Sequence, residues 1–364
     1  MSKLKGILLG DAMIPSPGFE GAWDKHLAPY GEKVFVGDWE TNWDALQRRR
    51  LVVEQRGPEI EPCDPLILEH GKDANVLCGL FIACSSKVMD AMPNLRMIGV
   101  CRAGLENVNV AEATKRGILV FNVMGRNAQA VSDFAVGLML AEARNSARAF
   151  HAIKTGQWRK KFSNSEFVPE LEGKTFGLVG FGYIGRLVAK KLRGWDPRIL
   201  VYDPYADPEG IKAAGCIPAT LEEVFSESDF VSLHARLTPE NKGMVDARLI
   251  GMMKPTAILV NTSRSGLVDQ DALVAALREK RILGAALDVF DIEPLPDDSP
   301  YLELDNVTLT THIAGTTADA LGKSPYLLMN EMAKFLRGED SPFIVNREVL
   351  EDPGFMAWLE SVRK

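Results

Sequence analysis

The stretch of sequence that decides the fold runs from residue 175 to residue 190 and reads TFGLVGFGYIGRLVAK. Its apolar first half is typical of a buried strand, its second half is typical of a helix, and the pattern Gly-x-Gly-x-x-Gly joins them. Gly180 permits a tight turn, Gly182 lets the backbone approach a diphosphate, and Gly185 allows close packing of the helix on the strand. This order of strand, glycine turn and helix predicts a nucleotide-binding βαβ unit.

The residues around this turn indicate a dinucleotide. The N-terminus of the following helix offers unpaired N–H groups to phosphate oxygens. The next apolar run ends at Asp203, which lies 18 residues beyond Gly185, close to the spacing of about 20 expected for an acid that binds a ribose hydroxyl. Because a carboxylate there repels a 2′-phosphate, we expect NAD rather than NADP. The alternative is a sheet of the same kind that has lost its ligand.

Short apolar runs alternate with helical patterns along the whole chain, which predicts an α/β fold of βαβ units with parallel sheets. The runs fall into two series and therefore predict two doubly wound sheets. Strands are expected at residues 6–9, 33–36, 76–82, 97–101 and 119–122, and then at 176–179, 199–202, 230–234, 258–261, 285–289 and 307–311. Between the series, apolar residues at helical spacing behind Asn127 predict one long amphipathic helix over 127–150. Another helix is expected over 319–336, followed by chain that proline interrupts.

Length and composition exclude several classes of protein. A chain of 364 residues with 46% apolar residues suggests two domains with sizeable cores. The 42 Lys and Arg residues against 49 Asp and Glu residues give a net charge of −7, which argues against nucleic acid as a partner. The five cysteines contain no Cys-x-x-Cys pair, and no apolar stretch is long enough for a membrane span or a signal peptide. We therefore expect a cytoplasmic protein without a membrane partner or a metal site.

Three side chains that can bind a substrate or transfer a proton follow later strands. Arg264, Glu293 and His312 each stand just beyond an apolar run, and ligands bind at the carboxyl ends of strands in open sheets. Taken singly, each has a structural alternative, such as a surface ion pair or a solvated loop residue. His234 also stands at a strand end, and we expect it to line the cofactor site without taking part in the chemistry.

Together these motifs resemble the NAD-dependent D-isomer-specific 2-hydroxyacid dehydrogenases, a family that includes phosphoglycerate, glycerate and D-lactate dehydrogenases. The resemblance rests on the glycine turn with its acid, on NTSR at 261–264, on DVFDIEP at 288–294 and on THIAG at 311–315. It continues upstream in GVCRAGLENV at 99–108 and spans residues 76–335. Motif order and context make this resemblance specific.

The resemblance implies an architecture. A Rossmann NAD-binding domain at 127–315 would be inserted into a flavodoxin-like substrate-binding domain at 1–126 and 316–364, with the active site in the cleft between them. It also implies a homodimer, formed with the help of the helix over 127–150. The small-molecule partner, which is the substrate, would be a 2-keto or 2-hydroxy acid.

The resemblance further implies an oxidoreductase that transfers a hydride between NAD(H) and a D-2-hydroxy acid. Arg264 would bind the substrate carboxylate and polarise the carbonyl, His312 would give or take the hydroxyl proton, and Glu293 would hold the imidazole in one tautomer. The cofactor-binding residues so implied are Gly180, Gly182, Tyr183, Ile184, Gly185, Asp203, His234, Thr262, Ser263, Arg264, Asp288, His312 and Gly315. The substrate-binding residues so implied are Arg102, Ala103, Gly104, Asn127 and Arg264.

Two departures from the family pattern bear on the substrate and the cofactor. Arg236 stands where proline is usual, and a cation there can reach a phosphate. Residues 82–87 lack the arginines that phosphoglycerate-oxidising members carry after an early strand, so phosphoglycerate is not the expected substrate. Lys87, Arg102 and Arg126 remain as candidates for a distal anion.

Two other functions are compatible with parts of the pattern. Some relatives are NAD-sensing corepressors, binding scaffolds without significant turnover that can keep the three candidate catalytic residues. Formate dehydrogenases carry Gln at the position of Glu293, which argues against that branch here.

Overall fold

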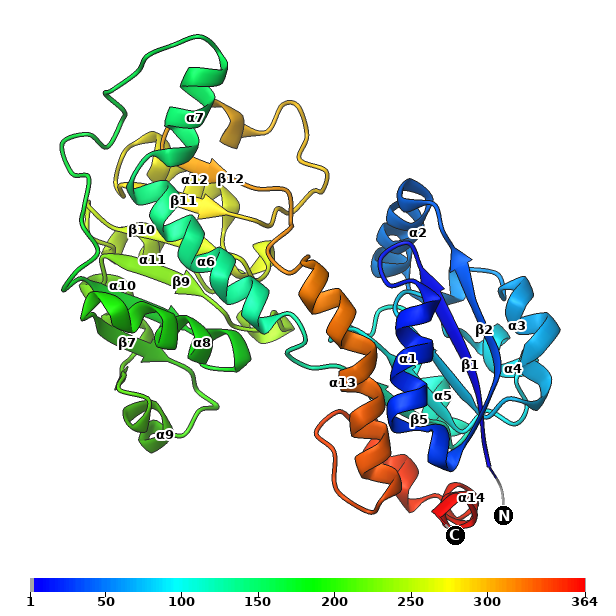
Figure 1. Cartoon of the computed structure of the whole chain (residues 1–364). Helices are drawn as coiled ribbons and strands as arrows, with labels where there is room; N and C mark the ends of the chain where they lie inside the picture. The colour runs from blue at the N-terminus through cyan, green and yellow to red at the C-terminus, as the bar shows by residue number, and fades with distance from the viewer. Residues whose placement is uncertain (1–2, 364) are drawn as a thin grey trace. The chain divides into compact units, whose positions relative to one another are not determined.

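The computed structural model describes residues 3–363 and divides the chain into two compact units (Figure 1). Residues up to 126 and from 317 onward form the first unit, and residues 127–316 form the second. The second unit is therefore inserted into the sequence of the first.

The first unit contains a five-stranded parallel sheet in the order β2-β1-β3-β4-β5. The strands are β1 (Leu4–Asp11), β2 (Gly31–Glu40), β3 (Val76–Gly79), β4 (Met97–Val100) and β5 (Leu119–Asn122). This order is that of the flavodoxin-like doubly wound fold. Side chains alternate between the faces, so Leu4 and Leu8 of β1 enter one core cluster, while Ile7 and Leu9 enter the other.

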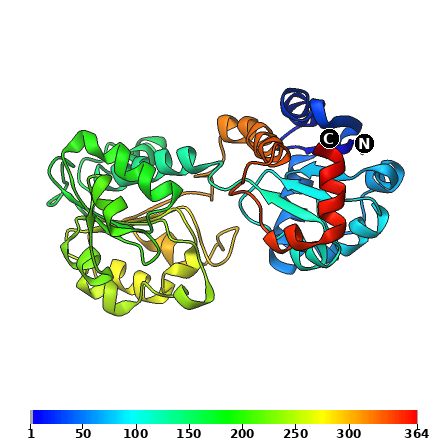
Figure 2. The same ribbon diagram turned by 90° about the horizontal axis from the view of Figure 1, so that it is seen from below.

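Helices cover both faces of this sheet. The first core cluster includes residues of α1 (Ser16–His26), α13 (Ala318–Leu336) and α14 (Pro353–Arg363), and Figure 2 shows α14 lying along the sheet. The opposite cluster includes residues of α3 (Pro65–His70), α4 (Ser86–Ala91) and α5 (Val110–Lys115). The helix α2 (Trp43–Arg56) follows β2. The helix predicted over 319–336 is present as α13 and packs on the first sheet.

The second unit contains a seven-stranded parallel sheet in the order β12-β11-β10-β9-β6-β7-β8. The strands are β6 (Thr175–Val179), β7 (Arg198–Tyr202), β8 (Ile217–Pro218), β9 (Phe230–Leu233), β10 (Ile258–Asn261), β11 (Gly284–Leu287) and β12 (Val307–Leu309). The strand order reverses between β6 and β9, as in the Rossmann fold, and ligands bind at such a switch point. The predicted α/β class with two doubly wound sheets is confirmed.

The helices of the second unit also lie on both faces of its sheet. The helices α6 (Ala128–Ala143), α8 (Tyr183–Leu192) and α9 (Pro208–Ala213) contribute to one core cluster. The helices α10 (Leu221–Glu227), α11 (Ala247–Met252) and α12 (Gln270–Arg278) contribute to the other. Short 3-10 helices occur at Ala28–Tyr30, Pro58–Ile60, Gly71–Asp73, Arg193–Trp195, Pro239–Asn241, Ser265–Leu267, Pro300–Glu303 and Arg347–Glu351.

The structure differs from the predicted elements at four points. The helix predicted over 127–150 is broken: α6 ends at Ala143, and α7 (Ser146–Lys154) begins after Asn145, whose φ of +57° cannot continue a helix. Asn127 precedes α6, but its side chain does not cap the helix. The short β8 was not predicted. The helix α14, in the region expected to be interrupted by proline, begins at Pro353, where proline is favourable.

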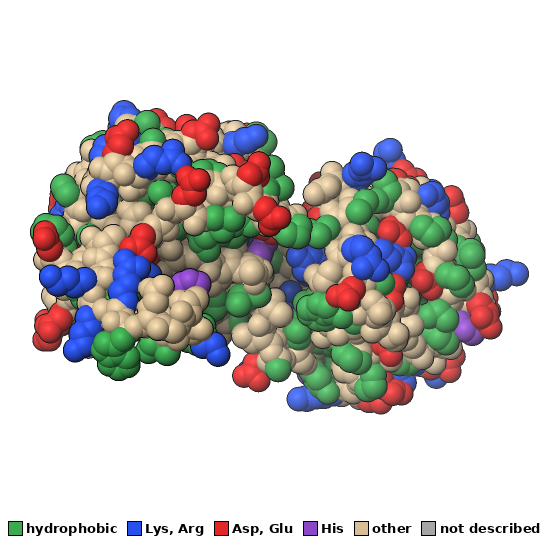
Figure 3. Space-filling model, turned by 90° about the horizontal axis from the view of Figure 1, so that it is seen from above, with side chains coloured by type: hydrophobic (Ala, Val, Ile, Leu, Met, Phe, Trp, Pro, Cys, Tyr) green, Lys and Arg blue, Asp and Glu red, His purple; other side chains and the backbone are tan. Residues whose placement is uncertain are grey.

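The surface of the chain carries both charge signs. Figure 3 shows Lys and Arg side chains intermixed with Asp and Glu over the visible face of the molecule. No helix among residues 3–363 is both long and apolar enough to span a bilayer.

Candidate active site

The glycine turn between β6 and α8 leaves room for a ligand at one position only. A Cβ on Gly180, whose φ is +99°, would lie 2.6 Å from the backbone nitrogen of Ala235, and a Cβ on Gly185 would collide with the carbonyl oxygen of Gly180. Next to Gly182, by contrast, a Cβ would meet no atom within 4 Å. No side chain caps the N-terminus of α8. This end of the helix is therefore open and offers N–H groups to an anion.

Asp203 stands directly beyond β7 and is fixed against the glycine turn. Its Oδ2 accepts a hydrogen bond from the backbone N–H of Phe181 at 2.7 Å, and its Oδ1 accepts one from that of Tyr205 at 2.9 Å. Each carboxylate oxygen can accept a further bond. The acid thus remains able to bind a hydroxyl beside the turn.

Two polar groups near the switch point are buried without a hydrogen-bond partner among the described residues. Both ring nitrogens of His234 are in this state, and so is the hydroxyl of Thr262. His234 follows β9, and its backbone N–H donates to the carbonyl of Val179 at 2.7 Å, which sets it beside the glycine turn. Burial lowers the pKa of the His234 imidazole to about 4, so the ring is neutral at physiological pH. These unpartnered polar atoms, the open helix end and an acid that can accept further hydrogen bonds together fit a dinucleotide.

The loop after β10 presents Arg264. Asn261, at the end of the strand, accepts hydrogen bonds at its Oδ1 from the backbone and hydroxyl of Ser263, and its amide donates to the carbonyl of Arg264 at 2.9 Å. The Arg264 side chain is exposed, and its Nη1 donates to the carbonyl of Ser263 at 2.8 Å. Sequence reasoning did not identify Asn261 as a site residue. Asn is nevertheless a typical residue for a turn in which the side chain bonds the backbone two residues further on.

His312 and Glu293 form a pair. The Nδ1 of His312 lies 2.7 Å from Oε2 of Glu293, and Oε1 of Glu293 accepts a hydrogen bond from the backbone N–H of Phe290 at 3.0 Å. Because an ionised carboxylate can only accept, the proton is on Nδ1 and Nε2 is available as an acceptor in the neutral ring. The structure thus brings together two of the three candidate catalytic side chains that the sequence scatters. Arg264 follows β10, whose neighbour β11 precedes the Glu293 loop.

Asp288 fixes the backbone around His312. Its Oδ1 accepts hydrogen bonds from the hydroxyl of Thr310 at 2.6 Å and the N–H of Ile313 at 3.0 Å, and its Oδ2 accepts one from the N–H of Ala314 at 2.9 Å. His312 itself has a φ of +55°, which is costly for a residue with a side chain. The buried carboxylate therefore holds this turn in place. Thr310 is a second residue of the site that sequence reasoning did not identify.

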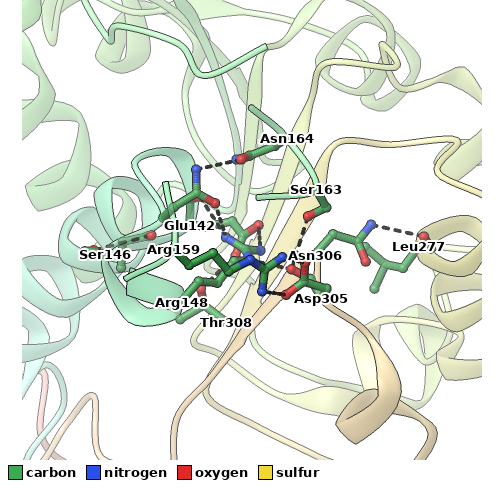
Figure 4. Close-up of polar contacts among 12 residues, drawn as sticks. Glu142, Ser146, Arg148, Arg159, Ser163, Asn164, Leu277, Asp305, Asn306 and Thr308 are labelled. Carbon is green, nitrogen blue, oxygen red and sulfur yellow. Dashed lines mark hydrogen bonds and ion pairs between the residues drawn. The ribbon is translucent and has the colours of Figure 1, made fainter. Parts of the chain in front are cut away.

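A buried polar network holds β12, the strand that precedes His312 (Figure 4). Glu142 of α6 is fully buried, lies 2.5 Å from Nη2 of Arg148 on α7, and accepts a hydrogen bond from the hydroxyl of Thr308 at 2.6 Å. Arg148 also donates to the carbonyl of Asp305, whose carboxylate pairs with Arg159 at 2.8 Å. Burial raises the pKa of Glu142, and the Arg148 guanidinium opposes this shift. The network joins α6, α7 and the following loop to β12.

The remaining predicted substrate and cofactor residues are divided between the two units. Asn127 lies in the second unit, and its side chain is so close to Gly315 that a Cβ there would collide with its amide. In the first unit, Arg102 pairs with Glu54 at 2.8 Å and Glu106 at 2.9 Å. Ala103 and Gly104 follow directly, and their N–H groups find no acceptor among the described residues. The substrate-binding assignment of these residues stays a prediction.

Comparison with known proteins identifies the family. A family model described as D-isomer specific 2-hydroxyacid dehydrogenase, NAD binding domain, matches residues 136–314. A glyoxylate reductase from Thermofilum pendens is 43% identical over 288 residues, which cover 77% of this chain and 83% of that protein. A glyoxylate reductase from Korarchaeum cryptofilum is 39% identical over 301 residues, which cover 82% of this chain and 91% of that protein.

Solved structures agree with this match. The crystal structure of the TT0316 protein from Thermus thermophilus superposes with a TM-score of 0.70 at 28% identity, covering 94% of this chain and 100% of that one. NAD is the cofactor of the second unit. The chain belongs to the D-isomer specific 2-hydroxyacid dehydrogenase family, and it is an NAD-dependent oxidoreductase of hydroxy acids.

Proposed function

We propose that Arg264, Glu293 and His312 carry out the interconversion of a 2-keto acid and a D-2-hydroxy acid. The observation that carries this proposal is the 2.7 Å contact between Nδ1 of His312 and Oε2 of Glu293 at the carboxyl end of the sheet. NAD(H), when bound, supplies or accepts the hydride. The side chains and backbone of this chain bind the substrate and transfer the proton.

In the reductive direction, His312 acts as the general acid. Its Nε2 gives a proton to the carbonyl oxygen of the substrate as that oxygen becomes a hydroxyl, and in oxidation Nε2 takes the proton back. When the ring is the imidazolium that gives this proton, its Nδ1 stays paired with the carboxylate of Glu293 on the opposite side of the ring. The turn fixed by Asp288 keeps the ring in one orientation.

Arg264 binds the substrate carboxylate in this proposal. Its exposed guanidinium has a planar set of donors that matches a carboxylate, and the Asn261 turn holds the backbone that carries it. A cation at this position also polarises the neighbouring carbonyl carbon towards hydride attack.

We assign the cofactor contacts to residues around the switch point. The open end of α8 at Gly182, Tyr183 and Ile184 suits the diphosphate, and Asp203 suits a ribose hydroxyl. His234, with its neutral ring and unpartnered nitrogens, suits a polar group of the dinucleotide. Ser263 and Gly315 remain cofactor-binding predictions.

The proposal also includes a homodimer through α7 and the loop that follows it. Large hydrophobic side chains are concentrated there: Phe150 is 67% exposed, Ile153 60% and Trp158 81%, and Phe167 is 56% exposed. Most apolar side chains of α6, by contrast, are buried within its own unit. An exposed apolar patch of this kind marks a protein contact.

Consumption of NADH in the presence of a panel of 2-keto acids tests the proposed reaction. The panel includes glyoxylate, which the names of the curated relatives suggest, together with pyruvate, hydroxypyruvate and longer acids. We expect turnover with at least one of them and none with ketones that lack a carboxylate. Tight binding of NADH without turnover on any acid would favour a binding scaffold instead.

A further inference from the structure

The strand β5 ends in a buried asparagine whose side chain reaches a neighbouring loop. Asn122, the last residue of β5, is 6% exposed, and its Nδ2 donates a hydrogen bond to the carbonyl of Ala103 at 2.7 Å. The same nitrogen lies 3.5 Å from Sδ of Met124, which is also an acceptor. Both amide hydrogens are therefore directed at acceptors, and the side chain is fixed in one orientation. Ala103 belongs to the loop that follows β4, the strand paired with β5.

The backbone of this strand end is held on both sides. Beside β4, β5 is the last strand of its sheet, and residues 343–345 cover its other side. The N–H of Asn122 donates to the carbonyl of Phe343 at 3.0 Å, and the N–H of Val345 donates to the carbonyl of Val120 at 2.9 Å. A side chain on a strand fixed in this way is a rigid support for the loop that it contacts.

Two successive carbonyls of the loop are bound by this strand end. The carbonyl of Arg102 accepts a hydrogen bond from the N–H of Val123 at 3.1 Å. The carbonyl of Ala103 is the one that Asn122 binds. In a planar trans peptide, the carbonyl and the N–H of the next residue point in opposite directions. The N–H groups of Ala103 and Gly104 therefore point away from the strand end.

These two N–H groups have no hydrogen-bond acceptor among residues 3–363. Ala103 is exposed and Gly104 is half-buried, so a ligand can reach them. The carboxylate of Glu106, which lies beside Gly104, is already paired with Nη2 of Arg102 at 2.9 Å. Successive N–H groups that point to one side bind anions, and a substrate carboxylate is such an anion.

We propose that Asn122 is a positioning residue for the reaction: it holds the carbonyl of Ala103 and thereby directs the N–H of Gly104 towards the substrate carboxylate. The inference rests on the proposed function, in which the substrate is a 2-keto or 2-hydroxy acid, and adds a residue to it. Asn122 contacts no reacting atom. Its contribution is that the peptide between Ala103 and Gly104 is already oriented before the substrate binds, so less conformational entropy is lost on binding.

Asn122→Asp tests this role, because the side chain keeps its shape but cannot donate when it is ionised. The carboxylate should repel the carbonyl of Ala103 and turn the peptide. We expect KM for the best 2-keto acid to rise by roughly 10- to 100-fold, the effect of losing one hydrogen bond to a charged group. The turnover number kcat should change less, and the affinity for NADH should stay the same, because the proposed cofactor contacts belong to the second unit. Asn122→Ala removes the donor without adding a charge and should also raise KM.

Asn346→Asp is the matched control. Asn346 is 3% exposed, its Nδ2 donates to the carbonyl of Ile118 at 2.9 Å, and its Oδ1 accepts from the N–H of Val120 at 2.8 Å. The same substitution thus places a carboxylate against a carbonyl next to the same strand, but not against the loop after β4. It should lower the thermal midpoint and leave KM unchanged. An equal rise of KM in the Asn346 and Asn122 variants would overturn the inference.

A second measurement does not depend on turnover. Oxamate has the carboxylate of a 2-keto acid but an amide in place of the reacting group. With NADH bound, oxamate should raise the thermal midpoint of the wild type and of Asn346→Asp, and raise that of Asn122→Asp less. Turnover with an unchanged KM in both Asn122 variants would overturn the inference and leave the proposed reaction intact. If the wild type reduced no acid, while the oxamate effect still depended on Asn122, the reaction would be wrong and the positioning role would stand.

Discussion

His312 illustrates how single residues build the site. Its left-handed backbone costs free energy that most residues avoid, and three hydrogen bonds to the buried Asp288 hold the surrounding turn. With the ring so placed, Nδ1 meets Glu293, and in the proposed reaction Nε2 exchanges a proton with the substrate. The chemistry of the pair thus depends on a residue that sequence reasoning assigned to the cofactor.

His234 provides a prediction that concerns pH. Its pKa of about 4 in the fold lies below the usual value of 6.5, so the unfolded chain binds more protons between these values. The fold should therefore lose stability as pH falls through that window, by up to about 1.4 kcal/mol per pH unit from this residue. Thermal midpoints of the apoenzyme, measured from pH 7 to pH 4.5, check this.

His234→Phe is the matched variant for that series, because it keeps a ring and removes the titrating group. Its midpoint should fall less steeply with acid than that of the wild type. Parallel curves for the two proteins would mean that the imidazole takes up protons in the fold, and the assignment of a neutral ring would be wrong.

The sequence indicated candidate residues of the site, but not the hydrogen bonds that position them. Arg264, Glu293 and His312 were singled out because each follows an apolar strand and because their motifs together resemble those of a family. Asn261 and Thr310 were not, because their contribution is a hydrogen bond to a neighbouring turn that only the folded backbone defines.

At the scale of elements, all strands except the short β8 were predictable, and the break between α6 and α7 was not. Buried parallel strands are apolar runs bounded by turn residues, which a sequence displays directly. The helical pattern continues across Asn145, but its side chain bonds Asn164 at 2.6 Å and Arg148 at 3.0 Å, and these contacts stabilise the left-handed turn. Tertiary hydrogen bonds therefore override the local pattern.

Arg148 is the residue that secures this junction. Arg148→Met should destabilise the second unit by about 3–5 kcal/mol, because it leaves the buried carboxylate of Glu142 without its cation. Since burial already raises the pKa of Glu142, the loss should be larger at pH 8 than at pH 5, where the carboxyl takes up a proton. Denaturant unfolding at the two pH values measures both effects.

The double variant Glu142→Gln/Arg148→Met is the control for this prediction. It removes both charges and keeps a side chain that can bond Thr308, so it should recover part of the stability and lose the pH dependence. If the single variant were as stable as the wild type at pH 8, the pair would contribute nothing to holding β12.

At the scale of the whole molecule, we propose a homodimer. The resemblance implies that the predicted helix over 127–150 helps to form the contact, and Phe150, at the end of that range, is one of the exposed hydrophobic side chains of α7 and the loop beyond it. That loop is attached to the turn before β12 through Arg159 and Asp305. Because this loop is anchored to its own unit, less conformational entropy is lost when its surface forms a dimer contact.

Trp158→Glu tests the contact. A charge in the centre of an apolar interface should weaken association by at least about 100-fold, since a desolvated ion costs several kcal/mol. Light scattering after size exclusion should give a dimer for the wild type and a monomer for the variant. Trp43→Glu changes an exposed tryptophan of the first unit and should stay dimeric. A monomeric wild type, or a dimeric Trp158→Glu, would exclude this surface.

The most direct test of the reaction is the rate of hydride transfer in a single turnover of His312→Asn, with NADH bound and the best 2-keto acid in excess. Loss of the acid should slow this step by roughly 10²- to 10⁴-fold at saturating NADH. A rate within a few-fold of the wild type would show that proton transfer does not pass through His312, and the assignment of the His312–Glu293 pair as the acid and base would be wrong.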